Sequence, residues 1–241
     1  MGRAHLVPEG FFDRDPQASV GVLVRRAFFI LLVCSQLVAA REANRFFVPE
    51  DAAVRYQETY GEQATRRLHG LLALMETLVT ATEEQKVAEV NRFFNQVEYA
   101  SDRAVWNRDD YWASRLEFLG KGRGDCEDFA VAKYLTMVQV GVPEDKVFLT
   151  YVKAIGYPDA AHLVVTYYAM PGAVPLVLDN YKKIILPATE RRDLIPVYSF
   201  TADDLYLQKQ QGLGKRINRK PLKNQKKLKA VDPEIRERGR S

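Results

Sequence analysis

The chain has 241 residues, of which 47% are hydrophobic, 27% are charged and 11% are aromatic, and it contains two cysteines. Such a chain can bury a substantial core in one domain with extensions, and its composition excludes a globally disordered protein and a disulfide-rich scaffold. The net charge of +4 is uneven: residues 215–241 carry eleven Lys or Arg against three acidic residues, whereas residues 41–214 have a net charge of −5. The basic balance therefore belongs to one end of the chain and does not indicate a nucleic-acid-binding protein.

The first forty residues have the pattern of an export signal. Two arginines precede a short apolar run over residues 27–34, and Val38 and Ala40 then occupy the small-residue positions of a cleavage site. The apolar run is shorter than the ~20 residues that a membrane-spanning helix needs. We therefore predict that residues 1–40 are a cleaved export signal, with an uncleaved anchor or a core helix as the alternatives.

The periodicity of the apolar residues changes along the remaining chain. Residues 51–100 follow a helical period, interrupted by a capping-box pattern at residues 82–85. Residues 126–140 are predicted to form a central helix that Gly141 and Pro143 end. After this helix the period falls to two, which is typical of β-strands. The predicted strands are residues 147–155, 162–170, 175–179 and 183–186.

This order of elements predicts an α+β domain over residues 41–210, with N-terminal helices and a central helix packed on an antiparallel sheet. Residues 211–241 are basic and contain few apolar residues, so we expect a disordered tail. Such a tail would be solvated, and attraction to anionic lipid head groups is the alternative.

Cys126 would open the central helix. Asp125 suits the N-cap, which places Cys126 at the first helical position. A thiol there meets unpaired N–H groups and the positive end of the helix dipole, both of which favour the thiolate. We therefore consider Cys126 a candidate nucleophile, whereas the common alternative for a lone cysteine is a small buried side chain.

A nucleophilic cysteine needs a base, and the residues after the leader offer His69 and His162. His69 follows two arginines in a helical stretch and is predicted to lie on the surface. His162 opens a predicted strand. If the next hairpin pairs residue 168 with residue 175, Asp179 lies diagonal to His162 and its carboxylate could orient the imidazole. A structural histidine is the alternative.

Three acidic residues surround the candidate nucleophile: Asp125, Glu127 and Asp128. Negative charge so close to a thiol raises its pKa and opposes thiolate formation. One interpretation is that these carboxylates only complement the helix dipole. The other is that they bind a hard cation, Ca²⁺ above all, which would neutralise them.

Several segments, in this order along the chain, resemble the LapG-type bacterial transglutaminase-like cysteine proteinases. They are residues 110–113 (Asp-Tyr-Trp-Ala), 116–120 (Leu-Glu-Phe-Leu-Gly), 124–130 (Gly-Asp-Cys-Glu-Asp-Phe-Ala), 150–153 (Thr-Tyr-Val-Lys), 161–163 (Ala-His-Leu), 176–180 (Leu-Val-Leu-Asp-Asn) and 196–200 (Pro-Val-Tyr-Ser-Phe). The resemblance covers roughly residues 51–207 and includes neither the leader nor the basic tail.

The resemblance implies a papain-like/transglutaminase-like core, with a catalytic triad of Cys126, His162 and Asp179. It further implies a periplasmic, calcium-dependent endopeptidase whose metal-binding residues include Asp125, Glu127 and Asp128. Enzymes of this type cut a large surface adhesin near its N-terminus, at a paired-alanine site, and so release cells from a biofilm. The implied partners are this adhesin and an inner-membrane cyclic-di-GMP receptor that sequesters the protease.

Two other functions fit the same residues. A transglutaminase or amidase would use the same thioester intermediate with a different acyl donor or an amine acceptor. A non-catalytic, calcium-dependent adaptor would bind the receptor or the adhesin without cutting it. For a protease that cuts between small residues we expect a narrow substrate groove, and Trp112 is a candidate wall, although it could equally be a core or docking residue.

Overall fold

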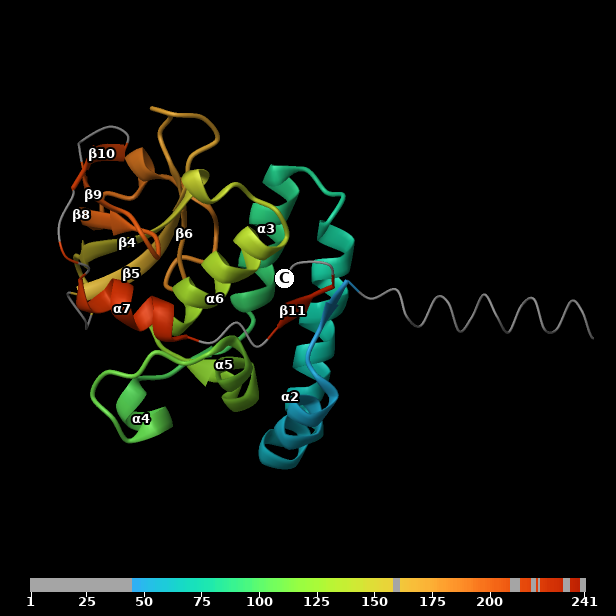
Figure 1. Ribbon diagram of the computed structural model, residues 1–241. Coiled ribbons are helices and arrows are strands. Elements are labelled where there is room, and N and C mark those ends of the chain that lie inside the picture. The colour runs from blue at the N-terminus through green and yellow to red at the C-terminus, as the bar shows by residue number, and fades with distance from the viewer. Residues whose placement is uncertain are drawn as a thin grey trace, which may run out of the picture. The chain divides into compact units, whose positions relative to one another are not determined.

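The computed structural model describes residues 45–157, 161–208, 213–217, 220, 222–231 and 235–238 (Figure 1). All of them belong to one compact unit that begins at Arg45, and the predicted export signal over residues 1–40 lies outside the described residues. Within the described part of the chain, no helix combines the length and the apolar character needed to cross a membrane.

Helices α2 (Glu50–Leu78) and α3 (Glu83–Phe94) form the predicted N-terminal helical region. The predicted capping box is confirmed at the start of α3: the Gln85 amide donates to Thr82 Oγ1 at 3.3 Å, and the Thr82 amide donates to Gln85 Oε1 at 3.0 Å. These bonds satisfy donors that a helix start otherwise leaves unpaired. Helix α2 is kinked at Gly61, whose φ of 77° is accessible to glycine without strain.

Short elements lead from α3 to the central helix. They are β2 (Glu98–Tyr99), α4 (Asp102–Trp106), α5 (Arg115–Lys121), β3 (Arg123–Gly124) and α6 (Cys126–Gln139). Strand β2 pairs in parallel with β3, which directly precedes the central helix. Gly124 is needed at this junction, because a Cβ there would lie 2.3 Å from Asp128 Oδ2 and 2.8 Å from the Phe118 ring. The missing side chain lets the backbone pass close to the carboxylate of the first helical turn.

Seven strands form an antiparallel sheet in the order β10-β9-β8-β4-β5-β6-β7. Their bounds are β4 (Val147–Ala154), β5 (Ala161–Tyr167), β6 (Leu176–Leu178), β7 (Leu186–Pro187), β8 (Leu194–Phe200), β9 (Leu205–Gln208) and β10 (Leu213–Arg216), with 3₁₀ turns at Glu144–Lys146 and Ala188–Glu190. The predicted hairpin register is confirmed: Val165 pairs with Leu178 and Thr166 with Val177, the alignment that places residue 168 opposite residue 175.

The predicted strand over residues 183–186 is wrong for most of its length, because β7 begins only at Leu186. Side chains of α3 take the place of a neighbouring strand. The Lys183 carbonyl accepts hydrogen bonds from Asn91 Nδ2 at 2.9 Å and from Asn95 Nδ2 at 3.3 Å. The backbone acceptor is thus satisfied without a ladder, which lets the chain after β6 turn away from the sheet.

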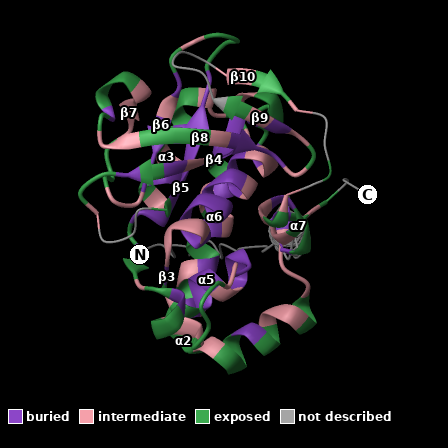
Figure 2. Cartoon of the chain, turned by 90° about the vertical axis from the view of Figure 1, so that its left-hand side faces the viewer, coloured by how far each residue is buried: buried purple, intermediate pink, exposed green. Residues whose placement is uncertain are grey.

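Helix α6 is the centre of the core and is mostly buried, as Figure 2 shows. It packs against β4 and β5 on one side and against α3 and α5 on others. Phe129 and Met137 of α6 are no more than 2% exposed, as are Leu149 of β4 and Val165 of β5. The predicted α+β arrangement, a central helix on an antiparallel sheet, is therefore confirmed. Because α6 is held from several sides, its first residue has a fixed position beside the sheet.

The prediction of a disordered tail over residues 211–241 is wrong for the parts of that segment that the structure describes. They contain β10, helix α7 (Lys223–Ala230) and β11 (Arg236–Glu237), and β11 pairs with β1 (Phe46–Phe47). The low apolar content wrongly predicted disorder, because a few apolar residues are enough to anchor this segment to the core. Leu228, Val231 and Ile235 are spaced by three and four positions and are 3%, 8% and 1% exposed. Several lysines are neutralised by acidic residues of the domain, as in the ion pair of Lys229 with Asp203 at 2.6 Å.

Candidate active site

Cys126 occupies the first position of α6, directly after the N-cap Asp125, as the sequence predicts. The residue as a whole is partly exposed. The thiol donates to Glu127 Oε2 at 3.0 Å and also lies against the backbone of Leu163 in β5. Burial and the nearby Glu127 carboxylate raise the pKa of Cys126 well above its ordinary value. The helix start alone therefore does not produce a thiolate here.

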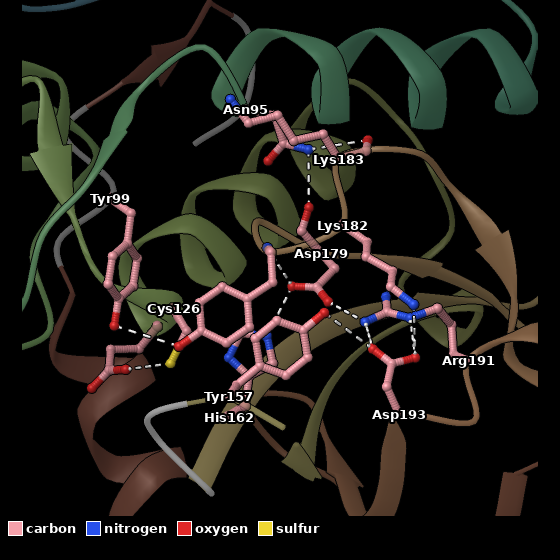
Figure 3. Close-up of polar contacts among 12 residues, drawn as sticks. Asn95, Tyr99, Cys126, Tyr157, His162, Asp179, Lys182, Lys183, Arg191 and Asp193 are labelled. Atoms are coloured by element: carbon pink, nitrogen blue, oxygen red, sulfur yellow. Dashed lines mark hydrogen bonds and ion pairs between the residues drawn. The ribbon is translucent and has the colours of Figure 1, made fainter. Parts of the chain in front are cut away.

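His162 lies in β5, one residue before the Leu163 backbone that the thiol contacts. Figure 3 shows the Cys126 sulfur and the His162 imidazole on neighbouring elements. The imidazole is fully buried, and its Nε2 lies 2.8 Å from Asp179 Oδ1. Within the described part of the chain, Nδ1 has no hydrogen-bond partner. One nitrogen is thus held by a carboxylate while the other is left for a reacting group.

Asp179 follows β6 and is fully buried in a dense set of donors. Oδ1 accepts from His162 and also from the Tyr181 amide at 3.0 Å, and Oδ2 accepts from Arg191 Nη2 at 2.5 Å. Burial alone would raise the pKa of Asp179, but the bond and charge of His162, with the Tyr181 amide and the Arg191 guanidinium, lower it to about 2. The group is a carboxylate at any neutral pH.

Arg191 and Asp193 extend this arrangement, and sequence reasoning missed both. Arg191 is 2% exposed, and besides Asp179 it binds Asp193 through Nε at 3.0 Å and Nη2 at 2.8 Å. Figure 3 shows the resulting row of polar side chains, from His162 through Asp179 and Arg191 to Asp193. The local sequence does not indicate that Arg191 is buried. Its ion pair with Asp179 forms only because the turn after β7 brings the two residues together.

Two further missed residues hold the backbone of Asp179 from the helix side. Asn95 Nδ2 donates to the Asp179 carbonyl at 2.9 Å, and Lys133 Nζ donates to the same carbonyl at 3.2 Å and to Asn95 Oδ1 at 2.8 Å. Burial lowers the pKa of Lys133 to about 7. Sequence periodicity does place Lys133 on the buried face of α6, and a lysine there is the signal that a polar site lies beneath.

The remaining candidates have other positions. His69 lies on α2 and is exposed, in agreement with its prediction as a surface residue. Trp112 is partly buried against the core, and Lys227 of α7 lies 5.3 Å from the centre of its ring. This contact makes Trp112 a packing partner of α7.

The acidic residues around Cys126 form two overlapping groups that share Asp102, a residue that sequence reasoning missed. One contains Asp102, Asp125 and Asp128; the other contains Asp102, Asp110 and Glu127, and in each group the carboxylate oxygens lie within 4.8 Å of one another. The predicted residues Asp125, Glu127 and Asp128 are thus brought together, but in two sets rather than one. Asp102 lies in α4 and reaches the helix start because β2 and β3 pair side by side.

These carboxylates have too few hydrogen-bond donors for their burial. Asp102 Oδ1, Asp125 Oδ1 and Asp128 Oδ2 are buried without a partner among the described residues. Burial, followed by the neighbouring negative charges, raises the pKa of Asp125 to about 10; burial, with Asp102 and Glu127, raises that of Asp128 to about 8. Clustered carboxylate oxygens of this kind suit a hard divalent cation, which would relieve their repulsion.

The site therefore combines the thiol of a partly exposed cysteine, an imidazole with one nitrogen held and one open, and an ionised carboxylate. Together these are the groups that acyl transfer through a thioester requires. The backbone N–H of Cys126, at the start of α6, is unpaired within the helix and is a candidate donor to an oxyanion.

Comparison with known proteins agrees with this geometry. Residues 64–193, more than half of the chain, match the family model of the bacterial transglutaminase-like cysteine proteinases. The calcium-bound structure of LapG from Legionella pneumophila is 36% identical, with a TM-score of 0.63 over 75% of this chain and 97% of LapG; the EGTA-treated structure is also 36% identical, with a TM-score of 0.63 over 76% and 97%. A further LapG structure is 39% identical, with a TM-score of 0.58 over 65% of this chain and 86% of that one.

No curated protein sequence matched the chain. The family model and the solved structures nevertheless agree with each other and with the predicted resemblance, and they cover the elements that carry Cys126 and His162. The chain therefore belongs to the family of bacterial transglutaminase-like cysteine proteinases.

Proposed function

We propose that the chain is a calcium-dependent cysteine endopeptidase in which Cys126 is the nucleophile, His162 the general base and acid, and Asp179 the residue that orients His162. The observation that carries the proposal is the state of the imidazole. Its Nε2 is held by Asp179, its Nδ1 is open, and the next residue of the strand touches the thiol. In a buried structural histidine both nitrogens are more commonly hydrogen-bonded.

In the proposed reaction, Nδ1 of His162 takes the proton of the Cys126 thiol while the sulfur attacks the peptide carbonyl. The backbone N–H of Cys126 donates to the developing oxyanion. His162 then gives its proton to the leaving amine as the C–N bond breaks, which leaves a thioester. Water, deprotonated by the same imidazole, hydrolyses the thioester and restores the thiol. Asp179 stabilises the imidazolium in both stages.

The carboxylates that would hold calcium are Asp102, Asp125 and Asp128, with Asp110 and Glu127 on the adjoining side. Their partnerless buried oxygens fit a hard cation of this kind. A bound divalent cation supplies positive charge beside Cys126 and removes the electrostatic penalty that these carboxylates impose on a thiolate. The LapG structures, which carry calcium or have been treated with EGTA, support the same cation for this chain.

The substrate, location and regulation follow from the resemblance to LapG-type enzymes. The substrate is the N-terminal region of a large surface adhesin, cut at a paired-alanine site, and the location is the periplasm, reached through the export signal of residues 1–40. An inner-membrane cyclic-di-GMP receptor sequesters the protease and so couples cleavage to biofilm release. Glu127 and Cys126, in the first turn of α6, are partly exposed, which is compatible with a protein substrate.

The test is mass spectrometry of an adhesin N-terminal fragment after incubation with the wild type or with Cys126→Ala, each with calcium and with excess chelator. The proposal expects two shorter fragments from the wild type in calcium and an intact fragment in the other three reactions. Cleavage by Cys126→Ala would refute the nucleophile, and full cleavage in chelator would refute the metal requirement. Crosslinked ladders would instead indicate a transglutaminase, and an intact but stably bound fragment would indicate an adaptor.

A further inference from the structure

The buried imidazole of His162 is covered by an aromatic ring that the proposed mechanism does not use. The ring of Tyr181 lies parallel to the imidazole, with 4.2 Å between ring centres and an angle of 3° between the planes. Such a parallel contact fixes the plane of the imidazole, since rotation about χ2 would drive its edge into the tyrosine.

Tyr181 is itself held on more than one side. Tyr157 stacks on its outer face at 4.6 Å and 18°, and Tyr99 meets its edge at 5.6 Å, with the two hydroxyl groups 3.5 Å apart. Tyr157 in turn donates to Asp193 Oδ2 at 3.4 Å. The outer ring of the stack is thereby tied to the carboxylate that also binds Arg191.

The backbone of Tyr181 contacts Asp179, the hydrogen-bond partner of His162. Its N–H donates to Asp179 Oδ1 at 3.0 Å, and this is the oxygen that also meets His162 Nε2. Tyr181 follows Asp179 by two residues, so the turn lets one residue touch both groups: the main chain fixes the carboxylate and the side chain fixes the imidazole. Tyr181 thus contacts both His162 and Asp179.

This arrangement has a consequence for proton transfer. The ring keeps water from the hydrogen bond between His162 and Asp179, which strengthens that bond in its low-dielectric surroundings. The π face of the tyrosine also favours the imidazolium that forms when His162 takes the thiol proton. Small displacements of a catalytic group are costly, and a misplacement of about 1 Å can reduce the rate ~100-fold.

We infer that Tyr181 is a positioning residue for the proposed acyl transfer, which holds the His162 imidazole in the plane that points Nδ1 at Cys126 and shields its hydrogen bond to Asp179. The inference rests on the proposed function and assigns to this site a part that neither composition nor spacing indicates. It is the ring, and not the hydroxyl, that performs the role.

The test compares Tyr181→Phe and Tyr181→Leu in calcium. Tyr206→Leu is the matched control, because Tyr206 is another partly buried tyrosine with an aromatic contact, to Phe148. We expect Tyr181→Leu to lower kcat for the adhesin fragment by ~10- to 100-fold with KM within about twofold, because positioning rather than binding is lost. Tyr181→Phe, which keeps the ring, should stay within about threefold of the wild type, as should Tyr206→Leu.

A second readout does not depend on cleavage. The Nε2 proton of His162, recorded by NMR in the Cys126→Ala background, should exchange with water faster by at least about tenfold in Tyr181→Leu and at the original rate in Tyr181→Phe. If Tyr181→Leu does not fold, Tyr157→Leu replaces it, since loss of the outer ring should accelerate the same exchange to a smaller degree.

The outcomes separate the two proposals. Absence of cleavage by the wild type would count against the proposed function, whereas unchanged proton exchange in the leucine variants would overturn the role of Tyr181 whatever the activity. Equal losses of kcat in Tyr181→Phe and Tyr181→Leu would also overturn it, because they would assign the effect to the hydroxyl. A loss in Tyr206→Leu as large as in Tyr181→Leu would reduce the effect to general destabilisation.

Discussion

His162 and Cys126 lie on neighbouring elements, yet the charges around them are balanced in opposite ways. On the histidine side (His162, Asp179, Arg191 and Asp193), each carboxylate is paired with a cation or an N–H donor, and burial strengthens those pairs. On the cysteine side (Cys126 with Asp102, Asp125, Glu127 and Asp128), three of the clustered carboxylates, those of Asp102, Asp125 and Asp128, each have one buried oxygen without a donor among the described residues.

The difference indicates how such a site is controlled. The carboxylates of the histidine side are paired by the chain's own groups, so their positions are fixed as soon as the chain folds. The cysteine side keeps buried oxygens that a cation from outside the chain would pair, so under the proposed function the Cys126 thiol is the half of the site that responds to calcium.

The largest effect is expected from Asp179→Ala. Loss of the carboxylate frees the tautomer and the orientation of His162, which should lower kcat/KM by about 10⁴-fold. It also leaves Arg191 buried with only one acidic partner, so the free energy of unfolding in urea should fall by about 3 kcal/mol. Asp203→Ala is the control, because that carboxylate is 79% exposed in its ion pair with Lys229. An Asp179→Ala variant with a tenth of the original activity would contradict the comparison.

The contributions of the two sides to the free energy of unfolding should change with pH in opposite directions. The folded pKa of Asp179 is lowered to about 2, so its contribution of about 2 kcal/mol is present above pH 4 and lost as the pH falls through 2. The folded pKa of Asp128 is raised to about 8, so in chelator its contribution is present below pH 4 and lost as the pH rises through 8. Urea unfolding of the wild type, Asp179→Asn and Asp128→Asn from pH 2 to pH 9 would measure how the free energy of unfolding changes with pH on each side. Changes of the same sign on the two sides would contradict the prediction.

Calcium should change the reactivity of the thiol and leave the histidine side unaltered. We expect the rate at which iodoacetamide labels Cys126 at pH 7 to rise by about tenfold or more on calcium addition, since a shift of one pKa unit changes the thiolate fraction tenfold. Asp128→Asn should reduce this response, whereas Asp109→Asn, at an exposed carboxylate, should not. A rate that calcium does not change would argue against a cation beside Cys126.

The smallest effect concerns helix α7. Lys227 pairs with Asp110, which belongs to the second acidic group. Lys227→Met removes a cation that competes for this carboxylate, so calcium should bind up to about fivefold more tightly by calorimetry. Lys229→Met is the control, because Lys229 pairs with Asp203 outside the acidic groups. Weaker calcium binding in Lys227→Met would show that the lysine supports the cluster.

The sequence predicts those parts of the site whose positions depend on residues close together in the chain. The N-cap at Asp125 places Cys126 at the start of α6, and the two-residue period with a short turn fixes the β5–β6 register, which brings Asp179 to His162. Both arguments use only neighbouring residues.

The missed residues depend on contacts between distant segments. Arg191 reaches Asp179 from the turn after β7, Asn95 from the end of α3, and Asp102 joins the acidic cluster from α4. The sequence around each of these polar residues does not show that the residue is buried, because the elements that cover it come from distant parts of the chain. The prediction of a disordered tail is wrong for the same reason, because Leu228 and Ile235 are buried only by residues of the assembled core.

The pairing of β1 with β11 joins the two ends of the folded unit: Phe46 lies opposite Glu237 and Phe47 opposite Arg236. During synthesis from the N-terminus this ladder cannot form until residues 236–237 are available, and closing so long a loop is slow compared with forming local helices. The two-stranded pairing that ties Phe46 and Phe47 to the far end of the folded unit is therefore a late step of folding, which follows the formation of the local helices.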